Sequence, residues 1–210
     1  MLHTDRLVLR WWTGADRAPF AALNADPIVM EHFPAPLSRT QSDALADQLD
    51  TDLAEHGWGW WAVEVRDSGS GAGPFAGFAG LAIPRFEAPF TPAVEIGWRF
   101  ARWAWGHGYA TEAAAAALDF AFSTLGRTEV VSFTATTNVR SQAVMRRLGM
   151  TRDADGDFAH PALPVDHPLS RHVLYRLSAA DWRTTISRPT AAVGESDPHA
   201  NLSNEGHPHP

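Results

Sequence analysis

Short segments in which apolar residues alternate with polar ones, or run together between turn residues, predict a series of β-strands. Their ranges are 6–12, 60–65, 75–83, 94–100, 129–135 and 172–177. A stretch rich in Gly and Ser at 67–74 separates the second strand from the third, so these two are expected to form a hairpin.

Apolar residues at three- and four-residue spacing predict helices between these strands. The clearest pattern is that of 42–55, where Leu45, Leu49 and Leu53 fall on one stripe and a glycine follows as an end signal. Pro27 interrupts the pattern of the first helix. The other expected helices cover 16–30, 113–125 and 138–148.

The elements follow the order strand, two helices, three strands, helix, strand, helix, and a terminal strand or hairpin. This order predicts a mixed α/β (α+β) domain with one crossover connection. At 210 residues, the chain fits a single domain that can bury a substantial core. We expect this domain to span 1–186. Pro, Gly, Ser, Asn and His dominate 187–210 without apolar periodicity, which is typical of a disordered tail.

Charge and composition exclude several classes of function. The formal net charge is −7, so no basic stripe is available to bind nucleic acid. The absence of cysteine excludes disulfides, thiolate metal sites and a cysteine nucleophile. The start of the chain lacks the apolar core of a signal peptide, and no apolar run is long enough to span a bilayer. We therefore expect a cytoplasmic protein that binds neither nucleic acid nor membrane and holds no metal.

The segment 105–112, Trp-Gly-His-Gly-Tyr-Ala-Thr-Glu, carries the most specific chemical information in the chain. It lies between the expected strand 94–100 and an Ala-rich helix. A glycine turn in this position collects unpaired backbone N–H groups at the positive end of the helix dipole. The segment is therefore predicted to hold a phosphate group.

Three kinds of phosphate-binding turn could account for this segment. A Walker loop needs Gly-Lys followed by Ser or Thr, which the sequence lacks. A dinucleotide turn needs a third glycine where Thr111 stands. Glu129 lies at the distance expected of its ribose ligand, but it begins a strand instead of ending one. The third kind, in which a strand and a few residues lead to Gly-x-Ala and a helix, fits best, and it resembles the acetyl-CoA signature of a known superfamily.

Three motifs resemble those of the GNAT N-acetyltransferase superfamily. Glu-Ile-Gly at 95–97 and Trp-Gly-His-Gly-Tyr-Ala-Thr-Glu-Ala at 105–113 resemble its acetyl-CoA signature. The similarity is greatest to the branch that includes the ribosomal-protein N-terminal acetyltransferases. Residues 4–10 resemble the first strand of that branch, and 138–150 resemble its later Asn-x-x-Ser…Gly-Met element. The resemblance covers residues 4 to about 182 and is specific because the motifs occur in this order.

This resemblance implies a GNAT fold, in which a mixed, mostly antiparallel central sheet is splayed at the acetyl-CoA site and flanked by about four helices. It also implies acetyl-CoA as co-substrate. Backbone groups of Trp98 and Phe100 would bind the pantetheine arm, and amides of the glycine turn would hold the pyrophosphate. Asn138 has an alternative role as the N-cap of its helix. The residues expected to contact the coenzyme are Trp98, Phe100, Gly106, His107, Gly108, Tyr109, Ala110, Thr111, Asn138 and Ser141.

Acetyl transfer to an amine needs a neutral amine, a polarised thioester carbonyl and a thiolate that can take a proton. Glu95 is the candidate base, because a carboxylate on the central strand could accept the proton of the amine directly or through water. Alternatively, Glu95 faces solvent or pairs with an arginine. Many GNAT enzymes use a tyrosine acid in the short helix, but 138–149 contains none, and Ser141 is the candidate in its place. Ser141 could also simply occupy the first helical turn.

The sequence determines the acceptor less closely than the coenzyme. His160, in an expected loop rich in Asp, His and Pro at 157–168, is a candidate substrate-binding residue. Glu31 is another, because the region between the first two helices borders the acceptor pocket in the family. We expect a primary amine, either a protein N-terminus or a small molecule, and a monomer or homodimer. The acidic net charge favours a cationic acceptor. A non-catalytic acyl-CoA-binding or regulatory module is the alternative.

Overall fold

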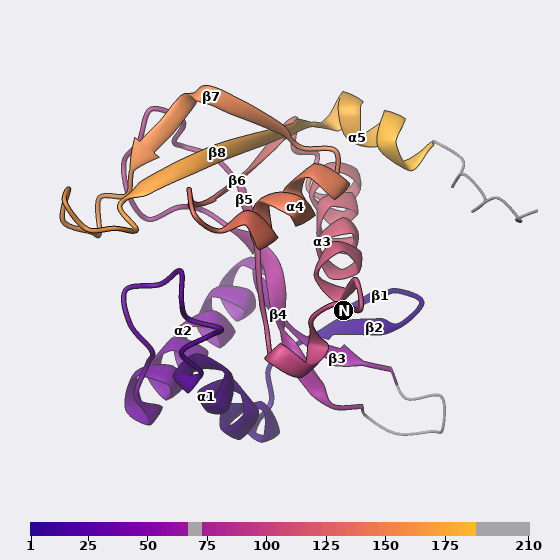
Figure 1. Ribbon diagram of the computed structural model, residues 1–210. Helices are drawn as coiled ribbons and strands as arrows, with labels where there is room; N and C mark the ends of the chain where they lie inside the picture. The colour runs from indigo at the N-terminus through magenta and orange to yellow at the C-terminus, as the bar shows by residue number, and fades with distance from the viewer. Residues whose placement is uncertain (67–72, 188–210) are drawn as a thin grey trace, which may run out of the picture.

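The computed structural model describes residues 1–66 and 73–187 (Figure 1). Most of the expected hairpin turn and nearly all of the expected tail at 187–210 lie outside these residues. The strands form one sheet in the order β1-β2-β3-β4-β5-β6-β8-β7, and only the neighbours β5 and β6 are parallel. The mixed α/β class and the mostly antiparallel sheet are therefore confirmed.

The elements follow the expected order, with additions at both ends of the chain. The strands are β1 Leu2–His3, β2 Leu7–Arg10, β3 Trp60–Val65, β4 Phe75–Ala82, β5 Glu95–Phe100, β6 Glu129–Ala135, β7 Thr151–Ala159 and β8 Arg171–Ser178. The helices are α1 Arg17–Ala25, α2 Arg39–His56, α3 Tyr109–Asp119, α4 Val139–Arg147 and α5 Ala179–Ile186. Among the described residues, none of these helices has both the length and the apolar character that crossing a membrane requires.

Helices cover both faces of the sheet. α1 and α2 pack together on one face, where Phe20, Leu23 and Leu49 join the buried side chains of Phe75 and Phe78 (Figure 1). α3 covers the opposite face, where its buried alanines pack among apolar side chains of β2, β3 and β5. α4 lies beside α3. The cavity of the molecule lies where the sheet opens from one of these faces to the other.

The first two helices differ in their bounds from the sequence prediction. The helix expected over 16–30 stops at Ala25, because Asp26 precedes Pro27 and adopts extended backbone with ψ of 114°. The second helix begins three residues earlier than expected, after Ser38. The side chain of Ser38 accepts a hydrogen bond from the Gln41 N–H, and the Gln41 side chain binds back to the N–H of Ser38, which forms a capping box.

α3 also begins earlier than predicted, at Tyr109 instead of Ala113. The helix therefore starts directly after the glycine turn, and its first-turn amides belong to that turn. It ends at Asp119 and is followed by a π-helical turn over Phe120–Thr124. Alanines on its inner face are fully buried and let the helix lie close to the sheet.

The C-terminal part of the domain forms a hairpin of β7 and β8, one of the two expected endings, but two of its features differ from the sequence prediction. Residues 157–159 were expected in a loop but belong to β7, and α5 was not expected at all. β7 is an edge strand whose pairing with β8 shifts between Asp153 and Phe158, and only Phe158 is buried. An edge strand with one buried residue has no clean alternation of polarity, so periodicity could not reveal it.

The sheet opens between its parallel strands. β5 and β6 share a single residue pair, Glu95 with Val131, and the Val131 N–H donates to the Val94 carbonyl at 2.9 Å. One residue further along, Ser132 Oγ donates to the Ile96 carbonyl at 2.8 Å. The strands form no further pairs toward the C-terminal end of β5, which confirms the expected splay.

Candidate active site

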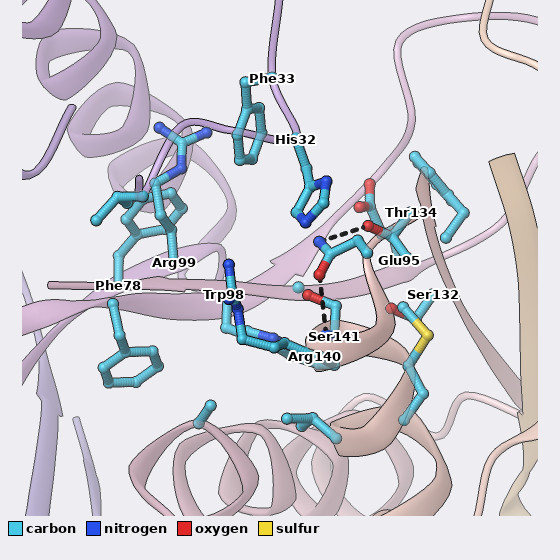
Figure 2. Close-up of a pocket in the computed structure, with 18 of the residues that line it drawn as sticks. His32, Phe33, Phe78, Glu95, Trp98, Arg99, Ser132, Thr134, Arg140 and Ser141 are labelled. Atoms are coloured by element: carbon cyan, nitrogen blue, oxygen red, sulfur yellow. Dashed lines mark hydrogen bonds between the residues drawn. The ribbon is translucent and has the colours of Figure 1, made fainter. Parts of the chain in front are cut away.

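A cavity of about 1020 Å³ occupies the splayed region and reaches both faces of the sheet. Leu45 and Leu49 of α2 line it on one face, and Val144 and Met145 of α4 line it on the other. Figure 2 shows side chains of β5, β6 and α4 converging on this cavity. Because one space connects the two faces, two ligands could meet end to end at the opening between β5 and β6.

The glycine turn forms one end of this cavity. Gly106 and Gly108 adopt φ of +80° and +79°, a backbone region that strongly favours glycine, and Gly108 is the N-cap of α3. The first turn of α3 presents amide groups that have no partner within the helix, beside its positive dipole end. Glycine without Cβ permits close approach of a phosphate, so the turn fits the pyrophosphate of acetyl-CoA.

A network from the N-terminal segment holds the turn in place. Glu112, in the first turn of α3, accepts hydrogen bonds from Thr4 Oγ1 at 2.6 Å and from the Arg6 N–H at 2.9 Å. The Arg6 guanidinium pairs with the same carboxylate at 2.6 Å and donates to the His107 carbonyl at 2.9 Å. The motif at residues 4–10 thus fixes the glycine turn from outside the cavity.

Glu95 lies at the point where β5 and β6 separate, and its side chain lines the cavity. Among the described residues, it has no hydrogen-bond or ion-pair partner. Burial raises the pKa of the Glu95 carboxyl to about 8. A carboxyl with this pKa can both accept and release a proton near neutral pH.

Asn138 and Ser141 lie on the α4 side of Glu95. The Asn138 side chain accepts a hydrogen bond from the Ser141 N–H at 3.1 Å and donates to Thr134 Oγ1 at 3.0 Å. Asn138 is therefore the N-cap of α4, which is one of the two roles expected from the sequence. Both side chains also line the cavity, so a contact with the coenzyme remains open to them.

The opposite wall of the cavity comes from the segment between α1 and α2 and from β5. His32, Phe33 and Arg99 line this part. Burial lowers the pKa of His32, so its ring is neutral at neutral pH. Glu31 forms an ion pair with Arg140 of α4, which connects this segment to the coenzyme side of the site.

His160 and His172 border the cavity near the end of β7. Their rings lie 5.0 Å apart between centroids, and Phe158 and Phe133 pack around them. Burial lowers the pKa of both imidazoles, which favours neutral rings. Within the described ranges, no group of three or more His, Asp or Glu side chains is placed to hold a metal ion.

Comparison with known proteins identifies the family. The model of the Acetyltransferase (GNAT) domain family matches residues 6–151, which is more than half of the chain. The chain belongs to the GNAT acetyltransferase family. It is therefore an acetyltransferase domain whose co-substrate is acetyl-CoA. The comparisons do not distinguish the branch of ribosomal-protein N-terminal acetyltransferases from other GNAT enzymes.

Individual relatives agree with this assignment. The chain is 31% identical over 150 residues to the uncharacterised Bacillus subtilis protein YkkB, an alignment that covers 71% of this chain and 84% of YkkB. It is 35% identical over 159 residues to the FsC-acetyl coenzyme A-N(2)-transacetylase of Aspergillus fumigatus, which covers 71% of this chain and 64% of that protein.

Solved structures share the GNAT fold. An acetyltransferase from Agrobacterium tumefaciens is 28% identical, with a TM-score of 0.65 over 84% of this chain and 92% of that one. The spermidine N-acetyltransferase of Vibrio cholerae, in complex with CoA and spermine, has a TM-score of 0.66 over 86% of this chain and 99% of that one. At 16% identity, this second likeness concerns the fold alone.

The structure brings most of the predicted site residues together. His107 does not line the cavity, since its ring stacks on Tyr109 at 5.3 Å, and neither does Glu31, which pairs with Arg140. Their predicted roles, like those of the others, remain predictions. The predicted residues that do line the cavity are Glu95, Trp98, Phe100, Gly106, Gly108, Tyr109, Ala110, Thr111, Asn138, Ser141 and His160.

Arg99 was missed by the sequence prediction, although a signal for it exists. Alternate residues of a strand share one face, so Arg99 belongs with Gly97 and Glu95 on β5. Arg140 was missed because its place depends on how α4 meets the segment between α1 and α2. Its guanidinium lies 4.6 Å over the ring of Trp105, a contact between helix and turn that no local pattern indicates.

Proposed function

We propose that this GNAT acetyltransferase transfers the acetyl group of acetyl-CoA to a primary amine, with Glu95 as the proton acceptor. The observation that carries the proposal is the position of Glu95. Its carboxyl lies at the opening of the sheet, in the same cavity as the glycine turn, without a partner among the described residues. Its pKa, raised to about 8 by burial, suits it to take a proton near neutral pH.

The chemistry follows from this position. The acceptor must lose a proton first, because an α-ammonium has a pKa near 7.7–8.0 and a lysine-type ammonium one near 10.4. Glu95 takes this proton directly or through a water molecule. The amine nitrogen then forms a bond to the thioester carbonyl carbon, and the carbon–sulfur bond breaks. The nitrogen loses its second proton as the amide forms, and the departing thiolate takes up one proton, with the Ser141 hydroxyl as the candidate relay between the two.

The coenzyme would lie with its pyrophosphate on the amides of 106–110 and its pantetheine arm along the unpaired edge of β5. Trp98 and Phe100 lie on this edge and line the cavity. The Phe100 carbonyl already accepts a hydrogen bond from Trp105 Nε1 at 2.8 Å, so Trp98 is the better candidate to bind the arm through its backbone. The acetyl group then points toward Glu95.

The acceptor is a protein N-terminus, as in the ribosomal-protein branch, or a small-molecule amine. One relative supports an amine in general, because the protein of Aspergillus fumigatus is named as an N(2)-transacetylase that uses acetyl coenzyme A. His160 lines the cavity and Glu31 lies beside it, which is consistent with their proposed contact with the acceptor.

Release of the free CoA thiol from acetyl-CoA, measured with a panel of peptides, amino acids and diamines, tests the proposal. We expect release that depends on the amine. Glu95→Gln should lower kcat by about 10²-fold or more, while the KM for acetyl-CoA stays within about threefold. The exposed Glu87 provides a control, because Glu87→Gln removes a carboxyl outside the cavity.

Two results would contradict the proposal. If Glu95→Gln retained full turnover, Glu95 would have no part in proton transfer. If the protein bound acetyl-CoA but no amine increased thiol release, the alternative of a non-catalytic acyl-CoA-binding module would be favoured. The absence of a tyrosine from 138–149 is the observation behind this alternative.

A further inference from the structure

Arg99 is a charged side chain in the cavity that the proposed chemistry does not use. Its Nη1 donates a hydrogen bond to Asn24 Oδ1 at 2.6 Å, and its guanidinium carbon lies 4.0 Å from the ring centre of Phe33. Burial lowers the pKa of Arg99 to about 10, so the side chain is still a cation at neutral pH. In the view of Figure 2, the guanidinium lies beside the Phe33 ring.

This cation has no counter-charge within the part of the chain that the structure describes. Among residues 1–66 and 73–187, no carboxylate oxygen lies within 4.0 Å of Arg99, whereas Arg10, Arg140 and Arg176 each have at least one. Its Nε is buried and has no hydrogen-bond partner there. A guanidinium has five N–H donors arranged in a fork that matches a carboxylate, and a buried unpaired cation is unfavourable. An anion that enters from the cavity would supply both the counter-charge of the guanidinium and a hydrogen-bond acceptor for Nε.

The position of Arg99 assigns this anion to the acceptor and not to the coenzyme. Ile96 and Phe100 pack on the face covered by α3, at whose N-terminus the glycine turn lies. Arg99 points to the opposite face, where it contacts Asn24 of α1 and lies 5.3 Å from the Phe78 ring. Gly97 confirms this direction, because a side chain there would come within 2.7 Å of the Trp60 ring.

We propose that Arg99 binds a carboxylate of the acceptor, which makes the substrate a primary amine that also carries an acidic group. This inference rests on the proposed function, because it needs an amine that reacts beside Glu95. Four residues of strand place the Cα atoms of Glu95 and Arg99 about 13 Å apart. The carboxylate therefore lies several bonds away from the reactive amine, as in a short peptide or an aminoalkanoic acid.

The charges and the shape of the cavity agree with this class of acceptor. Glu95 is the only acidic residue among the described residues that line it, against the arginines Arg99, Arg140 and Arg147. A polyamine would find one carboxylate there and would meet the cation of Arg99 on the acceptor face, while the charge of Arg140 is already matched by Glu31. The aromatic rings near the guanidinium would contact the apolar part of the acceptor between its two charged ends. The local charge thus opposes the cationic acceptor that the net charge of the chain favours.

The test compares matched acceptors that differ only in the acidic group. Glycine, diglycine, triglycine and tetraglycine, and aminoalkanoates of four to eight carbons, are each assayed beside their C-terminal amides. We expect the wild-type kcat/KM to be higher for the carboxylate than for the amide by about tenfold to a hundredfold at the best length. Free glycine should show little preference, because its two charged groups are too close together. The two series distinguish a peptide from an aminoalkanoate as the source of the carboxylate.

Two variants make the test specific to Arg99. Arg99→Met should remove the preference by lowering kcat/KM for the carboxylate while the value for the amide and the KM of acetyl-CoA stay within about threefold. Asn24→Asp keeps the side-chain volume, can still bind Ser42, and places a carboxylate beside Nη1, so it should remove the preference without disturbing the fold. Arg85→Met is the control, since Arg85 pairs with Asp52 outside the cavity.

Each outcome is informative. Loss of the preference in Asn24→Asp, with Arg85→Met unchanged, supports the inference even if Arg99→Met fails to fold, which its thermal midpoint would show. If the wild type acetylates amines without preferring carboxylates, or if the preference survives in Asn24→Asp, the inference is wrong while the proposed function stands. If no amine is acetylated, both fail together.

Discussion

At the scale of single residues, Glu95 shows how a functional group can lie in an environment that opposes its charge. Glu95 forms the only residue pair between β5 and β6, and it also lines the cavity. Burial without a partner raises the pKa of the carboxyl to about 8, whereas an unfolded chain has a Glu pKa near 4.5. Such a group is a useful proton acceptor, but its ionisation destabilises the fold.

The pH dependence of stability tests this environment independently of catalysis. The raised pKa favours the folded state fully below pH 4.5, and this contribution is lost as the pH rises to about 8. Glu95→Gln cannot ionise, so its thermal midpoint should rise relative to wild type between these pH values and level off above them. For a domain of this size, 1 kcal/mol corresponds to about 2–4 °C. Calorimetry from pH 4 to pH 9 measures the difference.

The exposed Glu87 again provides the control for this experiment. Glu87→Gln removes one carboxyl that is exposed and does not line the cavity, so it controls for the loss of a carboxyl as such. A constant difference for Glu95→Gln would mean that Glu95 is already ionised in the folded protein. In that case solvent in the cavity, and not a buried proton acceptor, would determine its chemistry.

At the scale of elements, the glycine turn and α3 form one unit. Gly106 and Gly108 give the turn its left-handed backbone, and Glu112 in the first helical turn accepts from Thr4 and Arg6. These contacts hold the helix start from outside, so its free amides face the cavity.

Gly108→Ala should weaken acetyl-CoA binding, because the added methyl would lie 3.4 Å from Arg6 Nη2 and strain the left-handed backbone, which displaces the turn whose amides are proposed to hold the phosphates. We expect the KM for acetyl-CoA to rise by about tenfold, with a loss of stability of about 1–2 kcal/mol from the left-handed backbone. Gly126→Ala is the matched control, with φ of +62° and open space around the glycine. It should lose similar stability and leave the KM unchanged. An equal KM in both variants would contradict the role of the turn.

Sequence periodicity predicted the elements in the middle of the sheet and failed at its ends. The strands at 60–65 and 129–135 were predicted with the bounds that the structure shows, because central strands alternate or are apolar throughout. β1 has only two residues, and β7 is an edge strand with one buried side chain, so neither has a clear period. The predicted start of α3 was also wrong, because the glycines suggested a turn up to residue 112 while the helix begins at Tyr109.

Prediction of the site was limited in the same way. Motif resemblance found the residues of the turn and of α4, since their spacing along the chain determines their contacts. The positions of the Arg99 and Arg140 side chains depend on which helix covers which face of the sheet. This is a tertiary relation that the local sequence does not show. Glu31 was expected at the acceptor, but its ion pair with Arg140 could not be read from either local sequence.

At the scale of the whole molecule, the sheet consists of two parts that meet at one place. β1 to β5 form one part and β6, β8 and β7 form the other, joined through Glu95–Val131 and the Ser132–Ile96 hydrogen bond. A continuous sheet would separate the α3 face from the α1 and α2 face. The incomplete junction lets the cavity cross the sheet, so that the coenzyme and the acceptor can approach from opposite faces.

Ser132→Ala tests whether this junction sets the width of the opening. Ser132 is 2% exposed and donates to the Ile96 carbonyl at 2.8 Å, so its loss should cost about 0.5–1.5 kcal/mol of stability. Ser170→Ala is the control, because Ser170 is equally buried, donates to the Val165 carbonyl at 2.9 Å and does not itself line the cavity. Thermal midpoints should fall in both variants.

The KM for acetyl-CoA should rise only in Ser132→Ala, because the coenzyme arm must then fit between strands whose spacing is no longer held. An unchanged KM would mean that Glu95–Val131 pairing alone maintains the opening, and the two parts of the sheet would then hinge on a single residue pair.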